Sequence, residues 1–259
     1  MIDLHSHVLP GIDDGPSDIA DSVEFARAAA EQGTTVLAAT PHLRGDFPLV
    51  DVEQLAASCD ALNEKLPADL DLEVVPGGEV DLMWAQNASD EELRLASFGQ
   101  RGTDLLVETP YGLISDTFED LLFRITVRGY RILLAHPERN PSFQRDPVRL
   151  RQIAERGVLI QITLPSVVPR DRGSRARKLA FALVREGLAH NMASDSHSSG
   201  RWRPPALAAG VEEFADHAPA YAEWMVTDAA AAILEGVALP SPPRSEAPRR
   251  GLRLPGWRR

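Results

Sequence analysis

Cysteine and long apolar stretches are scarce in this chain of 259 residues. Cys59 is the single cysteine, so an internal disulfide is excluded and no group of thiolates is available for a structural zinc site. No run approaches the roughly eighteen apolar residues that a membrane-spanning helix needs. Met1 leads directly into a predicted strand, without the basic segment that opens a signal peptide. We therefore expect a cytoplasmic protein without a membrane span.

Positive charge is also in deficit. The chain has 27 Lys and Arg against 38 Asp and Glu, a formal net charge of −11. Residues 244–259 hold six arginines against the single acid Glu246, and setting this +5 segment aside leaves −16 for the rest of the chain. Such an acidic body disfavours general nucleic-acid binding. It is compatible with a pocket rich in carboxylates that gathers cations.

Hydrophobic periodicity predicts strands and helices in alternation. Strands are expected over residues 2–5, 34–40, 72–75, 104–108, 131–135, 158–162 and 190–194. Helices are expected over residues 17–33, 52–66, 91–96, 118–128, 147–156, 175–186, 205–214 and 221–234. In the first helix, Ser17 is the expected cap, and the expected inward stripe is Ile19, Val23, Ala26 and Ala30. About seven strands, each followed by a helical crossover, favour one α/β domain with a parallel, barrel-like sheet.

Histidines and acids gather where the predicted strands end. His5 and His7 alternate along the first strand and therefore point the same way. Five of the seven histidines follow a predicted strand immediately, whereas His190 and His217 do not. In a barrel of parallel strands the carboxyl ends form one rim, which carries the chemistry. The residues expected on this rim are His5, His7, Asp14, His42, Glu79, Glu108, His136, Asp195 and His197.

This set of side chains predicts a metal cluster. Its donors are imidazole nitrogens and carboxylate oxygens, which suit Mn²⁺, Fe²⁺ or Zn²⁺, and the sequence does not choose among the three. Nine candidates are too many for a single ion. Clustered divalent ions a few Å apart are a known device for in-line displacement at phosphorus.

Two arginines lie within the same motifs. Arg139 is three residues after His136, and Arg203 is six after His197. Guanidinium is the preferred group for bidentate phosphate binding, so we expect both to contact substrate phosphate. Arg201 competes with Arg203 for this role, and the alternative for each is a solvated surface arginine.

A family resemblance rests on five stretches of the chain. They are Asp3-Leu-His-Ser-His-Val-Leu-Pro-Gly-Ile-Asp-Asp-Gly15, Ala39-Thr-Pro-His42, Gly78-Glu79, Ala135-His-Pro-Glu-Arg139 and Ala193-Ser-Asp-Ser-His197. Together they resemble the polymerase-and-histidinol-phosphatase (PHP) superfamily of metal-dependent phosphoesterases. Within it they are similar to the bacterial phosphotyrosine phosphatases of capsule and exopolysaccharide gene clusters, the CpsB/YwqE type. The resemblance covers about residues 1–235.

The resemblance implies a distorted (β/α)₇ barrel that holds three metal ions, usually manganese. One ion would take His5, His7, Glu79 and Asp195, a second Glu79, Glu108 and His136, and the third Asp14, His42 and His197. It also implies hydrolysis of a phosphate monoester, most directly phosphotyrosine on a bacterial tyrosine kinase that controls capsule synthesis. A thiolate phosphatase would need Cys-x₅-Arg, and Lys65 stands at that spacing from Cys59.

Other interpretations stay open at this point. The same chemistry fits histidinol phosphate, another small monoester or a nucleotide. A metal-binding scaffold without catalysis is disfavoured because the ligand set is complete. A nucleic-acid-binding module would rest on the basic tail alone. We expect a phosphatase domain over residues 1–238 and a disordered tail over residues 239–259, whose arginines are suited to an anionic membrane surface or an acidic partner.

Overall fold

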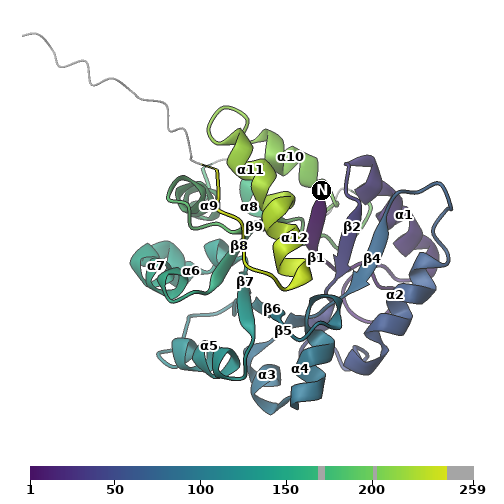
Figure 1. The fold of residues 1–259 in the computed structure, drawn as a ribbon, viewed down its shortest axis with the longest axis horizontal. Helices are drawn as coiled ribbons and strands as arrows, with labels where there is room; N and C mark the ends of the chain where they lie inside the picture. The colour runs from purple at the N-terminus through teal and green to yellow at the C-terminus, as the bar shows by residue number, and fades with distance from the viewer. Residues whose placement is uncertain (169–172, 201–202, 244–259) are drawn as a thin grey trace, which may run out of the picture.

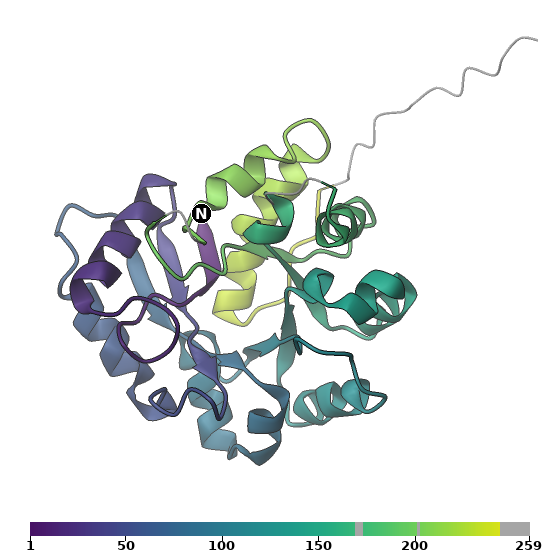
Figure 2. The same cartoon turned by 180° about the vertical axis from the view of Figure 1, so that it is seen from behind.

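Parallel strands occupy the centre of the molecule, and helices surround them (Figure 1). The computed structural model describes residues 1–168, 173–200 and 203–243. Figure 2 shows the same arrangement from behind, with the helices again outermost. None of the described helices is long and apolar enough to cross a membrane.

The strands form two sheets, and every pair within them is parallel. One sheet has the order β1-β2-β4, and the other has the order β3-β5-β6-β7-β8-β9. The strands are β1 (Ile2–Ser6), β2 (Val36–Ala39), β3 (His42–Leu43), β4 (Glu73–Pro76), β5 (Glu79–Val80), β6 (Asp104–Glu108), β7 (Arg131–Ala135), β8 (Leu159–Thr163) and β9 (Asn191–Ala193). The predicted α/β class and parallel pairing are confirmed; closure of a seven-stranded barrel stays a prediction.

The two sheets approach each other where β1 meets the segment after β9. The His7 amide donates to the Ser196 carbonyl at 2.9 Å, and the Asp195 amide donates to the His5 carbonyl at 2.9 Å. Ser6 and Ser196 also form an isolated parallel bridge. These backbone bonds bring the first and last motifs of the chain side by side.

The helices cover the outer faces of the strands. They are α1 (Ile19–Glu31), α2 (Leu55–Asn63), α3 (Leu82–Asn87), α4 (Asp90–Ala96), α5 (Phe118–Val127), α6 (Pro141–Arg145), α7 (Pro147–Glu155), α8 (Leu164–Val167), α9 (Arg175–Arg185), α10 (Leu207–Glu212), α11 (Pro219–Val226) and α12 (Asp228–Glu235), with 3₁₀ turns η1 (Val52–Gln54), η2 (Phe98–Gln100) and η3 (Pro137–Arg139). The short helices α3, α6 and α8 were not predicted. The stretch expected to form two Ala-rich helices forms three.

The inward face of α1 differs from the predicted stripe. Ile19 is 40% exposed, and the buried residues are Ser22, Phe25, Ala26 and Ala29. The helix is turned so that the large Phe25 ring, rather than Ile19, leaves water, which removes more apolar area. The cap was also wrong: Asp18, not Ser17, accepts from the first free amides of the helix.

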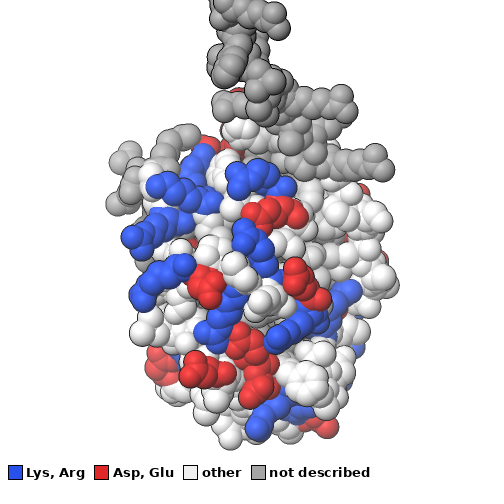
Figure 3. Space-filling model, turned by 90° about the vertical axis from the view of Figure 1, so that its left-hand side faces the viewer, with Lys and Arg blue, Asp and Glu red and all other residues white. Residues whose placement is uncertain are grey.

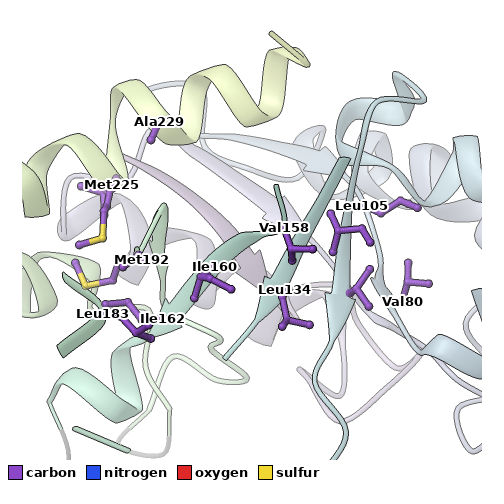
Figure 4. Close-up of a cluster of buried hydrophobic side chains, with 14 of the residues drawn as sticks. Val80, Leu105, Leu134, Val158, Ile160, Ile162, Leu183, Met192, Met225 and Ala229 are labelled. Carbon is purple, nitrogen blue, oxygen red and sulfur yellow. The ribbon is translucent and has the colours of Figure 1, made fainter. Parts of the chain in front are cut away.

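Alternation along the strands separates two groups of core side chains. Leu105, Leu134 and Ile160 lie in the larger cluster beneath the helices, of which Figure 4 shows a part. Leu106 and Leu133 belong to the second cluster, which includes Ala230 and Ile233 of α12. Because side chains alternate, Glu108 at the end of β6 lies on the same side of the strand as Leu106. The strand pattern therefore directs this acid to the interior.

Candidate metal centre

The nine acids and histidines expected on one rim converge in the structure. Four groups have ligand atoms that all lie within 4.8 Å of one another: His7, Asp14, His42 and His197; His5, His7 and Asp195; His5, Glu79 and His136; and His42, Glu79 and Glu108. Eight of the nine residues are buried, and Asp14 is exposed. The groups share members, so they form one connected cluster of side chains.

Strand register explains much of this convergence. His42 on β3 is paired directly with Glu79 on β5, and their Nδ1 and Oε2 atoms are 2.9 Å apart. His42 was expected to follow the predicted strand; it begins the short strand β3, which only Thr40 and Pro41 separate from β2. A side chain at Gly78 would come within 2.4 Å of Leu43, and the glycine before Glu79 thus permits the close approach of β5 to β3.

Glu79 is the hub of the cluster. Its carboxylate oxygens lie 3.3 Å from His5 Nε2, 3.6 Å from His7 Nε2, 2.9 Å from His42 Nδ1 and 2.9 Å from His136 Nε2. Burial acts to raise the pKa of Glu79, but His5, His136 and His42 hold it well below its usual range. The group is therefore a buried anion that faces four imidazoles.

Several histidine nitrogens at the centre lack a hydrogen-bond partner among the described residues. They are Nε2 of His5, Nε2 of His7 and Nδ1 of His42. Buried polar atoms are usually bonded, so nitrogens that face the Glu79 carboxylate at 2.9 to 3.6 Å without a well-formed hydrogen bond fit the binding of a cation between them. Burial lowers the pKa of His5, yet Glu79 and Asp195 outweigh it and raise that pKa to about 9. Glu79 and Asp195 thus stabilise a positive charge at His5. The imidazole and carboxylate groups of the cluster are donors that divalent metals accept.

Two polar side chains hold the first pair of histidines from outside. Gln161 Oε1 lies 2.8 Å from His5 Nδ1, and Asp13 Oδ2 lies 2.7 Å from His7 Nδ1. Both contacts leave Nε2 pointing to the centre, the usual arrangement of a metal-binding imidazole. The sequence analysis missed both roles. The available signal was a lone glutamine within the apolar strand β8 and an acid directly before Asp14.

Unusual backbone angles occur at two candidate ligands. His136 has φ of 39° and Asp195 has φ of 51°, in the left-handed region that non-glycine residues seldom adopt. His136 directly follows β7, and Asp195 is two residues after the end of β9. Both side chains turn into the cluster. Such strain is typical of functional positions that the surrounding structure fixes.

The four groups of close ligand atoms do not correspond one to one with the three ion sites that the resemblance implies. Asp14, His42 and His197 come together as expected, with His7 added. Glu108 and His136, expected to share an ion, fall into separate groups on either side of Glu79. Glu108 instead accepts from Arg44 Nη1 at 3.1 and 3.0 Å, a contact that was not predicted. Burial and the neighbouring Glu79 charge raise the pKa of Glu108.

The two predicted arginines meet at one carboxylate. Arg139 Nη1 donates to Asp195 Oδ2 at 2.8 Å, while Arg203 Nη2 contacts Oδ1 of the same residue. Arg203 Nη1 also lies 2.9 Å from His197 Nε2. One anion at this point can therefore contact both guanidinium groups. Arg201, the competing candidate, lies outside the described residues.

The remaining histidines and the cysteine are not in the four groups. His190 Nδ1 accepts from the Ile160 amide at 3.0 Å, and burial lowers its pKa to about 4. His217 packs edge-on against Phe181. Cys59 is buried in α2, where burial raises the pKa of its thiol to about 12. A neutral buried thiol is a poor nucleophile, which agrees with the exclusion of thiolate chemistry.

Comparison with known proteins gives consistent matches over most of the chain. The family model described as capsular polysaccharide synthesis, CpsB/CapC, matches residues 1–235. Tyrosine-protein phosphatase YwqE of Bacillus subtilis (strain 168) is 34% identical over 199 residues, 76% of this chain and 78% of that protein. Tyrosine-protein phosphatase CpsB of Streptococcus agalactiae serotype III (strain NEM316) is 26% identical over 220 residues, 80% of this chain and 87% of that protein.

A solved structure shows the same architecture. It superposes with a TM-score of 0.81 at 29% identity and covers 94% of this chain and 100% of that chain. It comes from a study of YwqE from Bacillus subtilis and CpsB from Streptococcus pneumoniae, described as unique metal-dependent tyrosine phosphatases. The chain therefore belongs to the CpsB/CapC family of capsular polysaccharide synthesis.

Proposed function

We propose that the chain is a metal-dependent tyrosine-protein phosphatase of capsular polysaccharide synthesis. The observation that carries this is the buried Glu79 hub, which faces four imidazoles, together with the two arginines that meet at Asp195. Family membership and the activity of the relatives point to the same reaction.

We further propose that the cluster holds three divalent ions, most directly Mn²⁺, with Fe²⁺ or Zn²⁺ as alternatives. His5, His7, Glu79 and Asp195 would hold one ion, and Asp14, His42 and His197 another. Glu79, Glu108 and His136 would hold the third. The catalytic domain would span residues 1–238 as a distorted (β/α)₇ barrel.

The reaction would be hydrolysis of a phosphate monoester without a covalent enzyme intermediate. Divalent ions held by these residues would lower the pKa of a bound water and offset the negative charge of the phosphate. Arg139 and Arg203 would bind the non-bridging oxygens and stabilise the charge that builds in the transition state. Gln161 and Asp13 hold the tautomers of His5 and His7, so that each presents Nε2 to the centre.

The proposed substrate is phosphotyrosine on a bacterial kinase of capsule synthesis or on the tail of that kinase. A basic tail suited to an anionic membrane surface was also predicted, and residues 244–259 lie outside the described residues. On the side of α5, α6 and α7, Lys and Arg are mixed with Asp and Glu (Figure 3). Arg149 pairs with Glu119 at 2.7 Å and Arg151 with Glu186 at 2.5 Å. Because basic and acidic side chains are paired on this face, it does not favour a nucleic acid or an anionic membrane. The membrane proposal therefore rests on the tail.

The test compares substrates and metals in one experiment. Chelated protein is assayed with a phosphotyrosine peptide, histidinol phosphate and a dinucleotide, before and after Mn²⁺, Fe²⁺ or Zn²⁺ is added back. We expect no turnover without metal, and the highest kcat/KM for the peptide with Mn²⁺. Preference for histidinol phosphate or the dinucleotide would overturn the tyrosine assignment but keep the hydrolytic chemistry. Full turnover by protein shown to be metal-free would overturn both.

A further inference from the structure

Aromatic side chains border the candidate metal centre on two loops that follow β3 and β6, the two strands that pair with β5. Phe47, after β3, stacks on the His42 ring with centroids 4.8 Å apart and planes at 19°. Tyr111, after β6, is 62% exposed. The guanidinium carbon of Arg44 lies 5.3 Å from the Phe47 centroid and 5.5 Å from the Tyr111 centroid, within cation–π range of both.

Arg44 connects these rings to the centre. Its Nη1 donates to both oxygens of Glu108, a member of the cluster. Partial burial, together with the Glu108 and Glu79 carboxylates, raises the pKa of Tyr111 to about 12. The carboxylates of the cluster therefore act on the Tyr111 hydroxyl through their charge, and the charge of Arg139 acts to lower the same pKa.

The loop that carries Tyr111 is fixed by side chains from the arginine motif. Asn140, directly after Arg139 and only 3% exposed, donates from Nδ2 to the Pro110 carbonyl at 2.6 Å and to the Gly112 carbonyl at 2.9 Å. These carbonyls flank Tyr111 on both sides. The Ile114 amide donates to Ser142 Oγ at 3.1 Å. An exposed tyrosine is ordinary by itself, but one held by a buried amide next to a candidate phosphate-binding arginine indicates a role.

We propose that Phe47, Arg44 and Tyr111 form a subsite that receives the aromatic ring of an aryl phosphate. This inference rests on the proposed function. A phosphoryl group held between the cluster and Arg139 leaves its ester substituent at the rim, where the exposed Tyr111 ring offers an apolar face. Arg44, already held by Glu108, fixes the positions of both rings before substrate arrives. Stacked or edge-on ring contacts favour an aryl over an alkyl substituent, and the subsite would select phosphotyrosine over alkyl monoesters.

Binding of non-hydrolysable phosphonates tests the subsite, because phosphonates remove the difference in leaving-group reactivity between aryl and alkyl esters. Calorimetry on the metal-loaded full chain compares phenylphosphonate with ethylphosphonate. The wild type is expected to bind phenylphosphonate more tightly. Tyr111→Ala should weaken phenylphosphonate about tenfold while ethylphosphonate changes less than about twofold, and Tyr111→Phe should restore most of the preference.

The matched control is Phe123→Ala on α5, which removes a ring of similar exposure (66%) on a helix outside the four ligand groups. It should leave both affinities at the wild-type values. Equal weakening of both phosphonates by Tyr111→Ala would show a disturbed cluster and overturn the subsite, as would no weakening of either. A wild type that prefers phenylphosphonate but hydrolyses no monoester would overturn the proposed function and leave the subsite in place.

Discussion

The amino and carboxyl ends of the same strands differ in how their charged side chains are paired. At the amino ends of β6 and β7, Asp104 accepts from Arg131 Nε, and Arg131 also donates to the Val237 and Ala232 carbonyls. This acid has one basic partner of its own. At the carboxyl end of β6, Glu108 instead joins a cluster of acids and histidines whose ligand atoms lie close together. The amino end of β6 thus carries an acid with its own ion pair, and the carboxyl end carries an acid that shares its surroundings with other candidate ligands.

Two histidines differ in the same way, in the charged groups that surround them. His190, before β9, is held neutral by burial, and its Nδ1 completes a backbone hydrogen bond. His5, on β1, is more deeply buried, yet Glu79 and Asp195 raise its pKa to about 9. Burial alone therefore does not decide the state of a histidine in this protein. Neighbouring charges also act: carboxylates outweigh burial at His5, whereas at His7 burial and the nearby His197 and His42 lower the pKa.

Glu79→Gln should have the largest effect, because it removes the charge that four imidazoles share while keeping the shape of the side chain. We expect kcat to fall about a thousandfold, with loss of bound metal. Steady-state kinetics and circular dichroism would be measured together. A variant with near wild-type kcat and full metal content would remove Glu79 from its central place.

Arg139→Lys should act next most strongly, since lysine keeps the charge but loses the planar fork that binds two phosphate oxygens. We expect kcat/KM to fall about a hundredfold, with metal content unchanged. Arg124→Lys on α5, outside the four ligand groups, is the matched control and should leave kcat/KM unaffected. An equal decrease in both variants would point to a general effect of replacing arginine.

Asp104→Ala addresses the other end of the strands. Removing this acid leaves Arg131, which is 26% exposed, without its carboxylate partner, so the free energy of unfolding should fall by about 2 kcal/mol. Urea denaturation would measure this, and kcat per folded molecule should stay at the wild-type value. A large loss of kcat with stability intact would remove the distinction between the two ends.

His190 should give the smallest effect, and its sign follows from its lowered pKa. The folded-state value of about 4 lies below the ordinary 6.5, so the unfolded chain takes up the proton first as pH falls. The neutral His190 ring therefore contributes to the free energy of unfolding above pH 6.5, and this contribution is lost as pH falls through about 4. Allowing for the partial exposure of the ring, we expect the contribution to be about 1 kcal/mol. His190→Gln should flatten unfolding stability over this interval in chelated protein. Identical pH profiles for the two proteins would contradict the assignment.

Much of the fold could be predicted because the strands are long enough to show their pattern. The strands β6 and β7 have the predicted bounds, since each is a short apolar run with charged residues beside it. The two-residue strands β3 and β5 have no periodicity to detect and arise only from pairing with each other and with β6. The α1 stripe was right at Ala26 but wrong at Ile19, because only tertiary packing selects Phe25 over Ile19.

The convergence of the candidate ligands could be predicted, but their connections could not. Histidines and acids directly after strands are visible in one dimension, and all nine converge in the structure. That Glu79 lies between Glu108 and His136, and that Arg44 pairs with Glu108, depends on register between segments far apart in the sequence. Gln161 and Asn140 were missed for the same reason, because each acts on a residue or loop from another strand.

Metal content is the most direct test of the central claim that the carboxyl ends of the strands hold a metal cluster. Wild-type, Glu79→Gln and Asp104→Ala proteins would be stripped with chelator, loaded with Mn²⁺, dialysed and analysed by mass spectrometry for metal per chain. We expect about three ions for the wild type and for Asp104→Ala, and fewer for Glu79→Gln. Less than one ion per wild-type chain, or equal content in all three proteins, would contradict that claim.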